Sequence, residues 1–97
     1  SDTHCQQLVR QTLHWWQMSK DEKNVVLALV YVTVALSKVN SLTSLFGTLK
    51  VNEVVDVDLK ELRAELDAYH RKVLKGVFKV APHVPSSSMV DLDLFVS

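Results

Sequence analysis

The apolar side chains of the first segment recur at the three- and four-residue spacing of a helix. Between Ser1 and Phe46 the chain contains neither glycine nor proline, so nothing interrupts this pattern. Over residues 2–18 the stripe consists of Cys5, Val9, Thr12 and Trp16. It is widened by Leu8, Leu13 and Trp15. The pattern predicts an amphipathic helix over residues 2–18.

A second helix is predicted from residue 20 onward. The sequence Ser19-Lys20-Asp21-Glu22 matches a capping box, in which Ser19 is the N-cap and Glu22 reaches back to it. The apolar run over residues 25–36 follows, and it is shorter than the roughly 20 residues that a membrane span needs. We therefore expect a core segment and no membrane span.

Two alternatives remain open for this second segment. Many of its residues are β-branched, which favours a buried strand, whereas Val25, Leu29, Val32, Leu36 and Val39 follow helical spacing. We favour a central helix. Its end is equally open: the helix stops at Asn40-Ser41 and a short extra turn follows, or it continues to Phe46 and Gly47 caps it.

A third long helix is predicted to begin at Asp58-Leu59-Lys60-Glu61, where acidic residues suit a helix N-terminus. Residues at heptad spacing continue to the prolines, and we call them the seam of this helix. Its members are Val55, Leu59, Leu62, Leu66, Tyr69, Val73, Gly76 and Val80. Pro82 and Pro85 cannot continue a helix, so the helix ends before them.

The last residues combine a serine-rich spacer with an alternation of apolar and acidic residues. Met89-Val90-Asp91-Leu92-Asp93 resembles the clathrin-box type of linear motif, with methionine where that pattern prefers leucine. We favour a different interpretation, in which Leu92, Leu94 and Phe95 pack onto the chain's own bundle or onto a second copy.

These elements predict an all-α fold. We expect a small antiparallel three- to four-helix bundle over residues 1–85, followed by an extended C-terminal tail over residues 86–97. The third long helix and its seam are compatible both with packing inside one chain and with oligomerisation or a coiled coil.

Composition adds a modest constraint on partners and location. Lysine plus arginine equals aspartate plus glutamate, eleven of each, so the formal net charge is zero. A domain that binds nucleic acid is usually basic. The single cysteine, Cys5, excludes an intrachain disulfide and suits a reducing compartment, so we expect an intracellular location, cytoplasmic or nuclear. The first residue is not methionine, and we expect a domain excised from a larger protein.

No set of residues has the spacing of a catalytic or metal site. The four histidines and Cys5 do not form a ligand pattern, because adjacent helical side chains such as His4 and Cys5 diverge by about 100°. Cys5 is the one candidate nucleophile, although a buried apolar role is commoner for such a residue. Asp56 and Asp58 fit a helix N-terminus better than an acid–base pair. We expect no enzyme, no cofactor and no metal ion.

The remaining interpretation is a non-catalytic helical domain for protein–protein interaction, scaffolding or self-association. Trp15 and Trp16 are candidate partner-binding residues, because a half-exposed tryptophan is a common interface anchor, although two buried tryptophans are the commoner arrangement. The alternative is a small helical nucleic-acid-binding domain that uses Lys72, Lys75 and Lys79 on one face of the third long helix.

Overall fold

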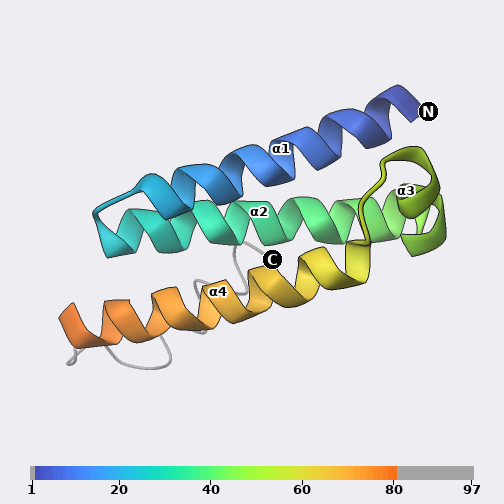
Figure 1. Cartoon of the computed structure of the whole chain (residues 1–97). Coiled ribbons are helices and arrows are strands. Elements are labelled where there is room, and N and C mark those ends of the chain that lie inside the picture. Colours follow the sequence, from blue (N-terminus) through green and yellow to red (C-terminus); the bar gives the residue numbers. More distant parts are fainter. Residues whose placement is uncertain (1, 81–97) are drawn as a thin grey trace.

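The computed structural model describes residues 2–80, which form four helices and no strand (Figure 1). They are α1 (Asp2–Asp21), α2 (Val25–Phe46), the short α3 (Thr48–Val54) and α4 (Leu59–Val80). The predicted all-α, antiparallel bundle is confirmed. The predicted spacer and tail, with Leu92, Leu94 and Phe95, lie outside the described residues.

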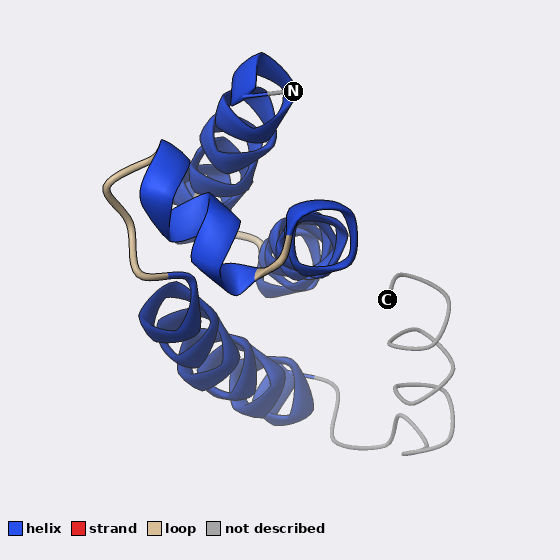
Figure 2. Ribbon diagram, turned by 90° about the vertical axis from the view of Figure 1, so that its right-hand side faces the viewer, coloured by secondary structure: helices blue, strands red, loops and turns tan. Residues whose placement is uncertain are grey.

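The long helix α2 is the centre of the bundle. Helices α1 and α4 each pack along it, whereas α1 and α4 make little direct contact with one another (Figure 2). The short helix α3 packs against all three long helices near the end of α2. The core therefore follows one side of α2. Its buried apolar residues are Cys5, Leu8, Val9, Leu29, Val32, Ala35, Val39, Leu42, Val51, Leu59, Leu62, Leu66 and Val77.

The junction between α1 and α2 corrects the predicted capping box. Helix α1 continues through Ser19 to Asp21, and Asn24 is the N-cap of α2. The Asn24 Oδ1 accepts hydrogen bonds from the Val26 and Leu27 amides at 3.0 and 3.2 Å. Glu22 supports this cap, because its Oε1 accepts from the Asn24 amide at 3.1 Å. The predicted capping box of Ser19 and Glu22 is therefore wrong, and the cap of α2 lies five residues later, at Asn24.

Helix α2 continues to Phe46, so the strand alternative and the early stop at Asn40 are both wrong. Gly47 ends the helix with a φ of +81°, a conformation that suits glycine, and its amide donates to the Thr43 carbonyl at 3.0 Å. The Thr33 hydroxyl donates to the Leu29 carbonyl at 2.6 Å, so this buried polar group is paired inside the apolar helix.

Helix α4 begins where the sequence predicted. The Asp58 Oδ1 accepts from the Lys60 and Glu61 amides at 3.1 and 3.3 Å, and Asn52 of α3 accepts from the Leu59 amide at 2.9 Å. These contacts satisfy amides that no helical carbonyl reaches.

The predicted seam of α4 holds in its middle and fails at both ends. Leu59, Leu62 and Leu66 are buried, but Val55 precedes the helix and Val80 is 70% exposed. Val77 is not a seam position, but it lies five full helical turns after Leu59 and is buried, whereas Val80 is the last residue of α4.

Candidate functional site

A groove lies between the end of α1, the start of α2 and the second half of α4. It exists because α1 and α4 both pack on α2 without closing on each other, while α3 fills only the opposite end of the bundle. Its volume is about 490 Å³. The residues that line this α1–α4 groove are Ser19, Lys20, Glu22, Val25, Ala28, Tyr69, Lys72, Val73 and Gly76.

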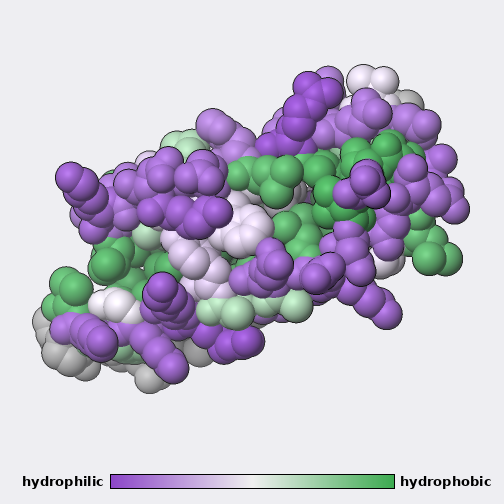
Figure 3. All heavy atoms as spheres, viewed as in Figure 1, coloured by the Kyte–Doolittle hydropathy of each residue, from purple (hydrophilic) through white to green (hydrophobic). Residues whose placement is uncertain are grey.

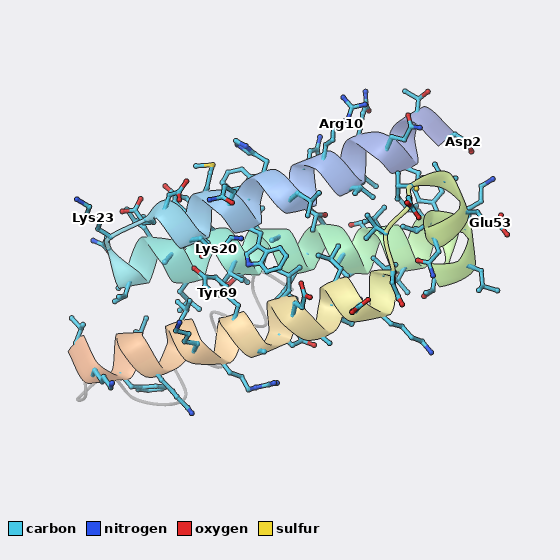
Figure 4. The ribbon with its side chains drawn as sticks, viewed as in Figure 1. Asp2, Arg10, Lys20, Lys23, Glu53 and Tyr69 are labelled. Carbon is cyan, nitrogen blue, oxygen red and sulfur yellow. The ribbon has the colours of Figure 1, made fainter. Side chains whose placement is uncertain are left out.

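A hydroxyl pair joins the helices inside the groove. The Ser19 Oγ donates to the Ala28 carbonyl at 2.7 Å. It lies 3.0 Å from the Tyr69 phenol oxygen, and since its own proton is committed, it accepts there. One buried serine of α1 therefore bonds to both α2 and α4. In Figure 4, Lys20 and Tyr69 lie over α2, between α1 and α4.

The borders of the groove are charged and its floor is apolar. Lys20 from α1 and Lys72 from α4 line it together with Glu22, which gives three formal charges and a net charge of plus one. On the face drawn in Figure 3, hydrophobic and near-neutral side chains occupy the space between α1 and α4, and hydrophilic ones border it. Such a surface suits a ligand that is apolar on one side and acidic at its edges.

Trp16 lies beside this groove, directly under Lys20. The Lys20 Nζ is 4.5 Å from the centre of the Trp16 ring, which is a cation–π contact. The Trp16 Nε1 is buried and has no hydrogen-bond acceptor among the described residues. Buried donors are usually paired, so this indole is a polar group whose hydrogen-bonding capacity is unused.

Gly76 widens the groove because it has no side chain. A Cβ placed there would meet only the Val25 Cγ1, at 3.8 Å, which is ordinary contact. Helix α4 therefore does not need glycine at this position for steric reasons, although glycine inside a helix lowers stability relative to alanine.

The other tryptophan, Trp15, lies away from the α1–α4 groove. The Trp15 ring lies 5.6 Å from the Tyr31 ring of α2 and 5.9 Å from the His14 ring. Trp15 and Trp16 are both half-buried, so the expectation of two fully buried tryptophans is wrong. The structure does not bring the two rings to one site, because neighbouring residues of a helix point about 100° apart.

A further surface lies on the side of α2 that faces away from the core. Val26, Leu27, Val30 and Val34 fall within about 100° of arc there, and we call them the outer face of α2. Val26 and Leu27 are 51% and 42% exposed, and the other two are half-buried. No described helix packs on this side (Figure 2). After Val34 its residues are mainly polar, although Leu45 on the same side is 60% exposed.

Helix α2 is also long and apolar enough to cross a membrane, judged by length and composition alone. The apolar run over residues 25–36 is too short to span a membrane, but the helix that contains it extends to Phe46. Only 39% of its most apolar window is buried in the protein. A core helix of a soluble protein passes the same test, so this property does not assign the helix to a membrane.

The predicted basic residues Lys72, Lys75 and Lys79 are all exposed on α4. Lys72 is the only one of the three at the α1–α4 groove, and the other two extend the positive charge toward the end of the helix.

Cys5 is not placed for nucleophilic chemistry. The thiol is fully buried in the core beside Leu8 and Val9. Burial raises the pKa of the Cys5 thiol, and the Asp2 carboxylate raises this pKa further. A raised pKa lowers the fraction of thiolate, which is the nucleophilic form.

Within residues 2–80, no three histidine, cysteine or acidic side chains come close enough to share a metal ion.

No pattern in the sequence indicates the groove or brings most of its lining residues together. Ser19 matches a helix cap in the sequence and Tyr69 belongs to the seam, and their contact spans fifty residues of sequence.

Comparison with protein-family models, with curated proteins and with solved structures found no match for this chain.

Proposed function

We propose that this chain is a non-catalytic interaction module that receives an apolar segment of a protein partner in the α1–α4 groove. The observation that carries the proposal is the open space between α1 and α4, which has an apolar floor and lysines on both borders. Helical domains commonly bind an amphipathic helix in such a groove. The partner is another protein or a second copy of this chain.

The charge of the groove predicts the character of the partner. Lys20 and Lys72 outweigh Glu22, so acidic residues should flank the apolar positions of the bound segment. Trp16, half-buried next to Lys20, supplies an aromatic side chain at the border, where interface anchors are enriched.

A peptide library displayed on phage tests this proposal, because it offers the groove many candidate segments at once. Peptides are selected on the intact chain and compared on the Gly76→Leu variant, whose new side chain fills the groove, and on the matched Gly76→Ala variant, whose Cβ fits. We expect peptides with an apolar repeat and acidic flanks that bind the intact chain and Gly76→Ala but not Gly76→Leu. Equal binding to all three proteins would refute the groove as the binding site.

Self-association is tested by light scattering of the same three proteins over a wide range of concentration. If the partner is a second copy, the mass should rise with concentration for the intact chain and for Gly76→Ala, and stay monomeric for Gly76→Leu. A monomer throughout would restrict the proposal to a different protein partner.

Binding of nucleic acid is a second candidate, favoured by the exposure of Lys72, Lys75 and Lys79 along α4. We expect little affinity, because the net charge of the chain is zero. Fluorescence anisotropy with random duplex DNA at physiological salt tests this. Micromolar binding that is lost in a Lys72→Glu, Lys75→Glu variant would place this function above the first.

A further inference from the structure

The outer face of α2 is an aliphatic surface without a covering helix in the described part of the chain. Val26 and Leu27 remain 51% and 42% exposed, and Val30 and Val34 continue the surface along the helix. Burial of one large aliphatic side chain stabilises a protein by about 1.5–3 kcal/mol. Four neighbouring aliphatic residues on one side of a helix therefore favour an occupant.

The position of the end of α4 makes a later segment of the same chain available to this surface. Helices α2 and α4 run antiparallel, and a Cβ at Gly76 would lie 3.8 Å from Val25, the first residue of α2. The described chain thus leaves α4 at Val80, near the start of the outer face. Residues 81–88 can reach roughly 26 Å. The outer face from Val26 to Val34 is only about 12 Å long.

The sequence of residues 89–96 complements the outer face in both polarity and charge. It contains six apolar residues and two acidic ones, Asp91 and Asp93, with no basic residue. Two lysines bracket the outer face along the chain: Lys23 precedes Val26, and Lys38 follows Val34 by one helical turn. Lys23 lies at the end of the molecule where α1 passes into α2 (Figure 4).

We propose that residues 89–96 bind to the outer face of α2 of the same chain, with their apolar side chains on Val26, Leu27, Val30 and Val34 and their carboxylates toward Lys23 and Lys38. A short tether gives the segment an effective concentration in the millimolar range. The intramolecular contact therefore outcompetes binding to a second copy at lower protein concentration. This surface is separate from the α1–α4 groove, and the proposal goes beyond the proposed function.

Paramagnetic relaxation in the 97-residue chain tests the contact. A nitroxide is attached at Ser97→Cys in a Cys5→Ala background, and the amide signals of the isotope-labelled protein are recorded before and after reduction of the nitroxide. We expect the Val30 and Val34 amides to broaden and to recover on reduction. The Val51 amide of α3, at the opposite end of the bundle, should stay sharp.

Two matched substitutions place the contact on the outer face. Leu27→Asp puts a carboxylate on the surface and should reduce the broadening of Val30 and Val34 several-fold. Leu49→Asp, at a residue of α3 that is 79% exposed, makes the same chemical change elsewhere and should leave the broadening unchanged. Equal effects of the two variants would overturn the proposal.

The remaining outcomes also decide the question. A mixture of nitroxide-bearing unlabelled chain with isotope-labelled chain lacking the nitroxide should show no broadening. Broadening that appears only in this mixture identifies a second copy as the occupant and overturns the intramolecular contact. Broadening at Val73 and Tyr69 in place of Val30 and Val34 would assign the segment to the groove and overturn the contact with the outer face. No broadening anywhere on the bundle would overturn the proposal altogether.

Discussion

Replacing Ser19 with alanine should destabilise the bundle, because one hydroxyl links all three long helices. The Ser19 Oγ donates to the Ala28 carbonyl at 2.7 Å and accepts from the Tyr69 phenol at 3.0 Å. Each such bond contributes about 0.5–1.5 kcal/mol, so their loss amounts to about 1–3 kcal/mol. Alanine is the better helix former by about 0.5 kcal/mol, which offsets part of this loss.

A double-mutant cycle with Tyr69→Phe cancels the difference in helix propensity between serine and alanine. Tyr69→Phe breaks only the bond to Ser19 and should lower the free energy of unfolding by about 0.5–1.5 kcal/mol. In the Ser19→Ala background the same change should have almost no effect. We therefore expect a coupling energy of about 0.5–1.5 kcal/mol, measured by urea unfolding followed with far-ultraviolet circular dichroism.

Two results would refute this reasoning. A coupling energy of zero between Ser19 and Tyr69 would mean that the hydroxyls do not bond in solution. A clear coupling between Ser19 and Glu22 would restore the capping box that the sequence predicted. The structure leads us to expect none, because Glu22 accepts from the Asn24 amide instead.

Three further changes have expected magnitudes that urea unfolding can measure. Asn24→Ala should lower the free energy of unfolding by about 1 kcal/mol through loss of the α2 cap, and Gly76→Ala should raise it by about 0.5–1 kcal/mol. Leu66→Ala, in the core, should cost about 2–5 kcal/mol, whereas Leu49→Ala at the surface should stay within about 0.5 kcal/mol; equal costs would contradict the packing. Burial raises the pKa of the Cys5 thiol in the folded state, so the folded protein holds this proton more tightly than the unfolded chain. Stability should therefore fall as the pH rises above the ordinary thiol pKa of about 8.5, and Cys5→Ala should remove this fall.

The parts of the fold that depend on local pattern could be predicted from the sequence. Leu59, Leu62 and Leu66 repeat at helical spacing, which predicts a shared inner side for them, and all three are buried. Asp58 caps α4 because its side chain reaches amides two and three residues ahead, which is a strictly local interaction.

The parts that depend on contacts between distant residues could not be predicted. Ser19 matches a local cap pattern, but its hydroxyl instead bonds to a carbonyl nine residues away and to a phenol fifty residues away. The α1–α4 groove requires the simultaneous placement of three helices, and nothing in the spacing of Lys20 or Lys72 indicates that they border the same space. For the same reason, periodicity did not show that both tryptophans stay half-buried.

The central position of α2 also has a consequence for how the molecule opens. Because α1 and α4 hardly touch, each is held mainly by α2 and can detach without first breaking the other interface. Amide hydrogen exchange should then divide the described chain into separate opening units. The slowest amides should lie in α2, near Val32 and Val39, which lose protection only when both flanking helices have left. The outer turns of α4 around Val80 should exchange first.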